Sequence, residues 1–147
     1  MIEVYTDGSS LGNPGKSGWA FLVNNNGIIS SRSGFSHKST NNQMEITAAI
    51  KAIEYLNNHE EMTIYTDSNY VKNGITLWIK NWKKNNWISS AKKTVKNQDL
   101  WKRLDQLNSV KKIYWKWIKA HDKNKFNNEV DLLARQSAEN LTESSFN

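Results

Sequence analysis

The sequence contains no cysteine and only one proline among its 147 residues. The lack of cysteine excludes a disulfide framework and any zinc site built from thiolates, and it suits a reducing compartment. No apolar run approaches the roughly 18 residues that a membrane-spanning helix requires. The first residues also lack the charged and apolar regions of a secretory signal. We therefore expect a soluble, cytoplasmic protein that does not associate with membranes.

The residues that are present suffice for one globular domain. Hydrophobic residues make up 37% of the chain and aromatic residues 11%, which is typical of folded proteins. A chain of about 150 residues buries close to 70% of its unfolded surface, so its core needs no metal or disulfide. We expect a single domain over residues 1–147, with a frayed tail at residues 142–147.

Basic side chains outnumber acidic ones by 20 to 14, which gives a net charge of +6 and a pI near 9.5. This excess indicates a polyanionic partner, with nucleic acid favoured over a membrane surface. A basic surface that serves only solubility would explain the net charge equally well. The positions of the charges along the chain must therefore decide between these two interpretations.

The spacing of apolar residues predicts an α/β fold with a mixed sheet. Alternation predicts a first strand that Gly8 stops, and a hairpin with its turn at Asn24–Gly27. Helical spacing begins after Thr40 or Asn41, either of which is a suitable N-cap, and a break is expected at Gly74. Strands are expected at residues 1–7, at two places within 17–36, at 62–67 and at 111–121, and helices at 42–58, 68–86, 97–108 and 127–141.

Two of the predicted strands end in the same three residues, Tyr-Thr-Asp. "VYTDG" occupies residues 4–8 and "IYTDS" occupies residues 64–68. A strand reached through a helical crossover usually lies parallel to the strand it joins. If these two strands are parallel neighbours, Asp7 and Asp67 lie side by side at their carboxyl ends. That edge is where open α/β sheets bind ligands.

Two further acids are predicted to point toward the same edge. Glu45 shares a helix face with Ala49 and Ala52, and an inward-facing glutamate is costly without a partner. Asp131 aligns with Ala134 near the first turn of the last helix. Any one of these acids alone is explained as a cap, a helix-dipole residue or a surface residue. Together they favour Mg²⁺ or Mn²⁺, because these ions prefer carboxylate oxygens.

Four stretches resemble ribonuclease H of type 1, the bacterial single-domain form: "YTDGSSLGNPGKSGW", "TNNQMEITAAIKAIEYL", "YTDSNYVKNGITLWIKNWKK" and "VKNQDLWKRLD". The resemblance runs nearly from end to end. It implies a five-stranded mixed sheet, with three antiparallel strands followed by two strands parallel to the first, flanked by helices. It also implies an endonuclease that hydrolyses the RNA strand of RNA–DNA hybrids and leaves 5′-phosphate and 3′-hydroxyl ends.

The resemblance also implies a catalytic set. Two Mg²⁺ ions roughly 4 Å apart would activate the attacking water and stabilise the leaving oxygen, and Mn²⁺ would be able to substitute. A loop histidine, here His121, assists proton transfer or product release. Ala120 and Asp122 beside it depart from the family pattern of glycine and a small residue. The metal-binding acids fall on Asp7, Glu45, Asp67 and Asp131.

Residues 78–103 concentrate the positive charge, with eight basic side chains, one acidic side chain and four of the seven tryptophans. This composition fits a protrusion that binds phosphates. Trp78 and Trp82, four residues apart on one helix face, fit the core equally well, and so does Trp101. The resemblance implies contacts to the DNA strand and its phosphates from Trp78, Trp82, Lys83, Lys84, Trp87, Lys92 and Lys93, and from a pocket made by Lys38, Thr40 and Asn97.

Contacts to the RNA strand are implied for Asn13, Asn41, Asn42 and, more weakly, Asn69, although any one asparagine also fits a cap or a turn. We expect a monomer with an RNA–DNA hybrid as its partner. A non-catalytic binding module on the same fold is the second hypothesis, but a pure binder gains nothing from acids that face a polyanion. Another metal nuclease or strand-transfer enzyme of this architecture, acting on DNA, is the third, and the asparagines argue against it.

Overall fold

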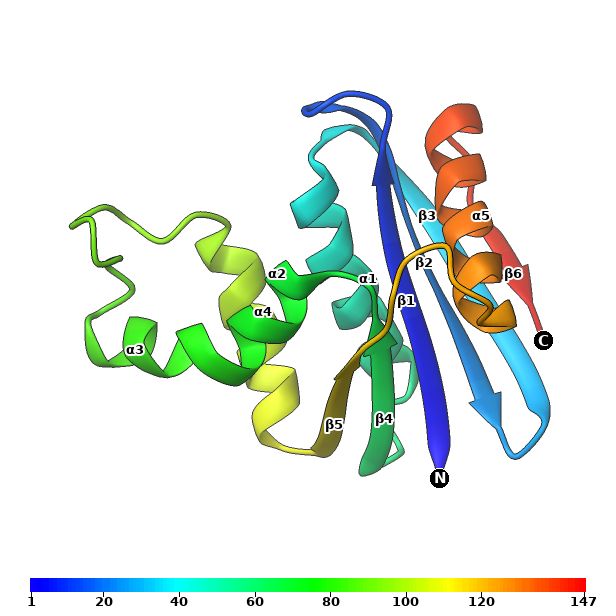
Figure 1. Cartoon of the computed structure of the whole chain (residues 1–147), viewed down its shortest axis with the longest axis horizontal. Helices are drawn as coiled ribbons and strands as arrows, with labels where there is room; N and C mark the ends of the chain where they lie inside the picture. The colour runs from blue at the N-terminus through cyan, green and yellow to red at the C-terminus, as the bar shows by residue number, and fades with distance from the viewer.

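A six-stranded sheet runs through the molecule in the order β5-β4-β1-β2-β3-β6 (Figure 1). The computed structural model describes all residues, 1–147. β1, β2 and β3 are antiparallel, whereas β4 is parallel to β1 and β5 is parallel to β4. The predicted mixed α/β sheet is therefore confirmed. The strands are β1 (Ile2–Ser10), β2 (Gly15–Asn25), β3 (Ile28–Ser39), β4 (Glu61–Thr66), β5 (Lys112–Trp117) and β6 (Ser144–Phe146).

Helices cover both faces of the sheet. α1 (Asn41–Tyr55) and α4 (Gln98–Ser109) enclose the larger core, in which Trp101 is fully buried, and α5 (Lys125–Asn140) packs on the opposite face around Tyr5 and Leu22. Between β4 and α4 the chain forms α2 (Asn69–Asn73), the π-helical turn η1 (Gly74–Trp78) and α3 (Ile79–Lys84). None of the helices combines the length and the apolar character that a membrane span requires.

Local hydrogen bonds explain where two predicted elements begin. Thr40 caps α1 through a capping box: its hydroxyl accepts from the Gln43 backbone N–H at 3.2 Å, and its own N–H donates to Gln43 Oε1 at 3.0 Å. The hairpin turn between β2 and β3 places Asn26 and Gly27 at positive φ. The Asn24 side chain accepts a hydrogen bond from Gly27 N–H at 2.8 Å. Both predicted boundaries are confirmed.

The first strand does not stop at Gly8, as the sequence suggested, but continues to Ser10 because β2 still pairs with it there. Its parallel pairing with β4 ends at Thr6 opposite Thr66. Asp7 and Asp67 are therefore the first residues beyond the parallel pair, side by side as predicted. Gly8 is needed here, because an added Cβ would lie 2.5 Å from the backbone nitrogen of Glu45.

Three other expectations require correction. The tail does not fray: residues 144–146 form β6, which pairs with the open edge of β3 and makes a sixth strand. Gly74 does not break the helix; the chain continues through it as a π-helical turn, with the Trp101 ring against the bare glycine. The last helix begins at Lys125, so Asp131 lies in its second turn and not near its first.

Candidate active site

Three carboxylates meet at the end of the parallel strand pair. Each of Asp7, Glu45 and Asp67 offers an oxygen within 4.8 Å of the other two. Asp7 lies on β1, Asp67 directly follows β4, and Glu45 lies in the second turn of α1, which the capping box fixes in place. We call these three residues the acidic cluster. The sequence predicted this grouping.

Burial makes the charges of the acidic cluster unfavourable. Asp7 is 4% exposed and Glu45 is 5% exposed. Burial, followed by repulsion from Asp67, raises the pKa of Asp7 from its ordinary 3.8 to about 8, and a hydrogen bond from Gly8 N–H opposes this rise. The pKa of Glu45 is raised well above its ordinary value, first by burial and then by Asp7. Burial, followed by the charge of Asp131, also raises the pKa of Asp67.

The acidic cluster fits a divalent cation. Glu45 Oε1 is buried and has no hydrogen-bond partner. The four salt bridges of the protein involve other acids, so no lysine or arginine neutralises the cluster. A group of carboxylate oxygens without sulfur ligands suits Mg²⁺ or Mn²⁺, and a bound cation would reverse the pKa shifts that repulsion causes.

Asp131 and His121 lie at the rim of the site. Asp131 is outside the 4.8 Å group, but it lines the same hollow, of about 400 Å³, as the acidic cluster. Its Oδ2 atom is 3.6 Å from Arg135 Nη2 and 3.9 Å from His121 Nδ1. The His121 side chain is 79% exposed, and its backbone is left-handed with φ 56°. We call the cavity lined by the acidic cluster and Asp131 the active-site hollow.

The asparagines predicted to contact RNA gather at this hollow. Asn41, Asn42 and Asn69 all line it. Asn13 lies in the loop between β1 and β2, and its side-chain oxygen accepts a hydrogen bond from Asn41 N–H at 3.0 Å. The loop is therefore tied to the start of α1. The fold thus brings together three segments that are distant in sequence.

The residues predicted to form a phosphate pocket are also connected. Asn97 Oδ1 accepts a hydrogen bond from Gln43 Nε2 at 3.2 Å, and Gln43 is the residue that completes the cap of Thr40. Asn97 is the N-cap residue of α4 in a left-handed conformation, φ 60°, but its side chain makes no capping hydrogen bond to that helix. Lys38 is exposed near the end of β3. The pocket residues thus lie at the starts of α1 and α4 and at the end of β3.

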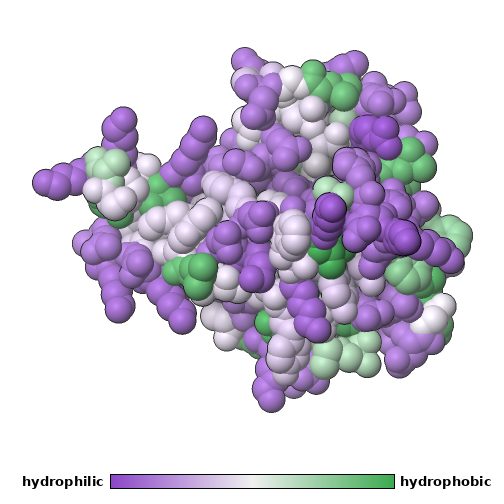
Figure 2. All heavy atoms as spheres, viewed as in Figure 1, coloured by the Kyte–Doolittle hydropathy of each residue, from purple (hydrophilic) through white to green (hydrophobic).

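The segment of residues 79–97, which we call the basic arm, projects away from the sheet (Figure 1) and carries hydrophilic side chains along its length (Figure 2). It contains six lysines and no acid. Lys84, Lys92 and Lys93 are exposed, whereas Lys83 pairs with Asp105 at 3.1 Å. The charge excess is therefore concentrated on one projecting feature, which favours a polyanion over a merely soluble surface.

The tryptophans of this region mostly pack on one another. The Trp82 ring is 6.0 Å from that of Trp78, 6.2 Å from that of Trp87 and 5.5 Å from that of Trp101. Trp101 is fully buried, and Trp82 and Trp87 pack against the core, so the core interpretation is right for Trp101. Trp78 is 37% exposed and retains a free surface.

Sequence reasoning missed three side chains at the site: Gln43, Tyr70 and Asn127. The Thr-x-x-Gln spacing from Thr40 to Gln43 is a capping-box signal and would have identified Gln43. Asn127 is 1% exposed, and its amide faces Asp67 and opposes the rise of that pKa. Asn127 precedes Asp131 by one helical turn, and this spacing would have indicated that the two side chains lie on the same face of the helix. Nothing local in the sequence distinguishes Tyr70.

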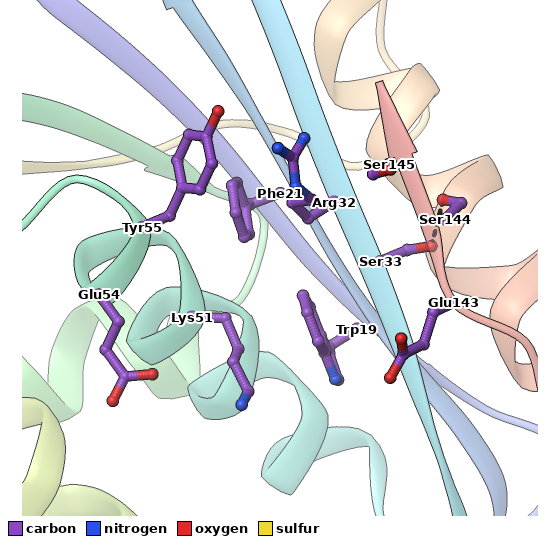
Figure 3. A pocket seen from close by; sticks show the side chains of 10 residues that line it. All are labelled: Trp19, Phe21, Arg32, Ser33, Lys51, Glu54, Tyr55, Glu143, Ser144 and Ser145. Carbon is purple, nitrogen blue, oxygen red and sulfur yellow. Dashed lines mark hydrogen bonds between the residues drawn. The ribbon is translucent and has the colours of Figure 1, made fainter. Parts of the chain in front are cut away.

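A larger hollow, of about 730 Å³, lies between α1, β2, β3 and β6 (Figure 3). Two of its charged groups already have partners: the Arg32 guanidinium lies 4.8 Å from the centre of the Tyr55 ring, and Glu54 binds Arg103 at 2.9 Å. None of the acids of the active-site hollow lines it. The smaller and more polar hollow is therefore the candidate site.

Comparison with known proteins agrees with this geometry. Residues 1–139 match the RNase H family. The chain is 46% identical over 141 residues to the ribonuclease H of Francisella philomiragia, covering 96% of this chain and 93% of the relative.

Two solved structures are also similar. LC9-RNase H1, a type 1 RNase H with the type 2 active-site motif, superimposes with a TM-score of 0.85 at 27% identity, covering 97% of this chain and 74% of that protein. A foamy viral protease-reverse transcriptase in complex with RNA/DNA hybrid superimposes with a TM-score of 0.83 at 26% identity, covering 93% of this chain and 20% of the viral protein. The chain belongs to the ribonuclease H family.

Proposed function

We propose that the protein is a monomeric, cytoplasmic endonuclease that hydrolyses the RNA strand of RNA–DNA hybrids and leaves 5′-phosphate and 3′-hydroxyl ends. The observation that carries this proposal is the acidic cluster, in which Asp7 and Glu45 are buried and Asp67 is half-buried. No lysine or arginine pairs with the cluster, and three asparagines line the same hollow. The similarity to ribonuclease H of other bacteria supports it, and so does the similarity to a viral protein in complex with RNA/DNA hybrid.

The residues have distinct proposed roles. Asp7, Glu45, Asp67 and Asp131 would hold two Mg²⁺ ions, with Mn²⁺ able to substitute; when bound, these ions supply an activated water and stabilise the leaving oxygen. Asp7 and Glu45 are buried and rigidly placed, so their carboxylates are oriented before any ion arrives. His121, exposed at the rim, is placed to move a proton or to help the product leave.

Selectivity for a hybrid requires that each strand be read by a different surface. Asn41, Asn42 and Asn69 line the hollow of the acidic cluster, and Asn13 is hydrogen-bonded to Asn41. We propose that these four residues recognise the 2′-hydroxyls of the RNA strand. The pocket of Thr40, Asn97 and Lys38 and the basic arm would bind phosphates of the DNA strand. Because such contacts read the backbone and its shape, we expect little preference for base sequence.

A non-catalytic binding module is disfavoured by the electrostatics of the acidic cluster. Three acids with raised pKa values destabilise the folded state, and their charge repels a nucleic acid when no cation is present. A protein that only binds the hybrid would gain from replacing them. Retention of the cluster is therefore better explained by a reaction that uses it.

The test is cleavage of a labelled RNA–DNA hybrid with and without Mg²⁺, beside matched duplex RNA and duplex DNA. We expect Mg²⁺-dependent cuts in the RNA of the hybrid alone, with labelled ends that accept ligation as 5′-phosphates. Asp7→Asn should abolish cleavage but retain binding of the hybrid in EDTA, because the basic arm is unchanged. Binding without cleavage by the unmutated protein, in Mg²⁺ or Mn²⁺, would identify a binding module instead.

A further inference from the structure

The hydroxyl group of Tyr70 connects the active-site hollow to the start of α4. Tyr70 lies in α2, three residues after Asp67, and it lines the active-site hollow. Its phenol oxygen accepts one hydrogen bond from Asn97 Nδ2 at 3.1 Å and another from Trp101 Nε1 at 3.2 Å. The hydroxyl hydrogen donates to no acceptor within the protein. With two bonds accepted, donation is the interaction that this hydroxyl still offers.

Asn97 is held from both sides as a result. Gln43 donates to its side-chain oxygen, and its side-chain nitrogen donates to Tyr70. Gln43 is fixed in turn, because its own oxygen accepts from Ser39 Oγ at 2.7 Å and from Thr40 N–H at 3.0 Å. An unbroken series of hydrogen bonds therefore runs from the cap of α1 through Asn97 to Tyr70, three residues after Asp67.

The phenol ring is itself immobilised. Its centre lies 5.2 Å from that of Trp101 and 5.9 Å from that of Trp78. Trp101 is fully buried in the larger core, against Gly74. Tyr70 also follows Ser68, whose side chain caps α2 by accepting from Val71 N–H at 3.1 Å. The position of the hydroxyl relative to Asp67 is thus set by backbone and core together.

We propose that Tyr70 is a positioning residue, which fixes Asn97 of the DNA-phosphate pocket relative to the acidic cluster. In the complex, the free hydroxyl hydrogen of Tyr70 is donated to the DNA phosphate bound in that pocket. This inference rests on the proposed function. Its physical basis is that both strands of a hybrid must be held at one fixed separation for an RNA phosphate to reach the acids. Asn97 and Tyr70 provide that separation on the protein side.

The test uses a set of hybrids in which one DNA phosphate at a time is replaced by an uncharged methylphosphonate. With the unmutated protein, one position should raise KM by about tenfold, because a hydrogen bond to a charged group is lost. Asn97→Ala and Tyr70→Phe should each raise KM for the unmodified hybrid. In each variant, a methylphosphonate at that same position should cause no further rise in KM. Each substitution should also change kcat less than it changes KM.

Two control variants separate positioning from stability. Trp101→Phe removes the other donor to the phenol oxygen and should lower the melting temperature, yet it should retain the methylphosphonate effect. Tyr114→Phe removes an exposed hydroxyl that donates to Glu61, at the opposite end of β4 from Asp67, and it should change neither KM nor the methylphosphonate effect. Melting temperatures of all variants are measured in parallel.

The outcomes distinguish the two proposals. If Tyr70→Phe keeps the full methylphosphonate effect while Asn97→Ala loses it, Tyr70 does not position the pocket and the inference is wrong. If the unmutated protein cleaves hybrid but no DNA phosphate is sensitive, the pocket itself is refuted, and the inference with it. If the unmutated protein cleaves no hybrid at all, the proposed function is refuted.

Discussion

The carboxyl group of Asp7 links the pH dependence of stability to metal binding. Its pKa is about 8 in the folded protein and near 3.8 when unfolded, so between these values the folded state holds a proton that the unfolded state has released. Stability without metal should therefore fall as pH rises from about 4 to about 8. Asp7→Asn should flatten this fall, measured by urea unfolding in EDTA across that range.

The effect of Mg²⁺ on stability should also depend on Asp7. Addition of Mg²⁺ at pH 8 should raise the stability of the unmutated protein, because a ligand that binds only the folded state stabilises it. The same addition should have little effect on Asp7→Asn. The control is Asp99→Asn, which removes an exposed carboxylate and should leave both the pH dependence and the response to Mg²⁺ unchanged. Parallel pH curves for Asp7→Asn and the unmutated protein would contradict the assigned pKa.

His121→Ala should slow cleavage by about 100-fold, the lower end of the range for general acid–base groups, without abolishing it, because the acidic cluster remains. Its melting temperature should stay unchanged, since the side chain is 79% exposed and lies 3.9 Å from Asp131. Single-turnover cleavage and multiple-turnover kcat are measured together to separate chemistry from product release. His59→Ala, at an exposed residue beyond α1, is the matched control. Complete loss of cleavage would mean that His121 is indispensable.

At the scale of single residues, the sequence predicted the grouping of the acidic cluster, because Asp7 and Asp67 end two neighbouring parallel strands and Glu45 lies on the apolar face of a helix. The same reasoning could not find Tyr70 or Asn127. Their importance lies in partners that are distant in sequence, such as Asn97 for Tyr70. The sequence also could not predict which tryptophans are buried and which are exposed, because Trp78 and Trp82 share a helix face yet differ in exposure.

At the scale of the elements, Glu45 lies near Asp7 because α1 packs closely against β1. Gly8 allows this close packing because it has no side chain. Gly8→Ala would place a Cβ 2.5 Å from Glu45 N and 2.6 Å from Met44 C, so the helix must move away. We expect a loss of about 1–3 kcal/mol in the free energy of unfolding and a loss of about tenfold in Mg²⁺ affinity. Urea unfolding and calorimetric titration with Mg²⁺ measure the two effects.

A variant of comparable stability distinguishes displacement of the helix from general weakening. Ile53→Ala creates a cavity under the same helix, where Ile53 is fully buried, but well along the helix from Glu45. It should lose stability and keep its affinity for Mg²⁺. Equal losses of Mg²⁺ affinity in Gly8→Ala and Ile53→Ala would show that Gly8 has no special role in placing Glu45.

Periodicity predicted most elements, because β5 alternates half-buried and exposed residues over most of its length and the longer helices each bury one face. The sixth strand could not be predicted in this way. Residues 144–146 are exposed and have no alternation, and they become a strand only because the edge of β3 offers free hydrogen-bonding groups. The extension of β1 past Gly8 likewise depends on β2, a partner that a local pattern does not reveal.

At the scale of the whole molecule, the distribution of charge separates the acidic cluster from the basic arm. The negative charge of the acidic cluster lies within the fold at the end of the parallel strands, whereas the basic arm projects from it (Figure 1). Under the proposed function, a polyanion would be attracted to the arm, and bound cations would lower its repulsion by the acids at the active-site hollow. Net charge alone could not predict this separation, which depends on how the chain folds.

Removal of charge from the basic arm should therefore weaken binding in a way that depends on salt. Lys92→Ala combined with Lys93→Ala should raise the dissociation constant for hybrid in EDTA. The slope of log K against log salt concentration should become less steep by about 0.9 for each lost phosphate contact. Lys112→Ala combined with Lys116→Ala removes the same charge from exposed positions on β5 and should leave the slope unchanged. Equal slopes for both double variants would mean that the protein binds through its net charge and that the arm has no distinct role.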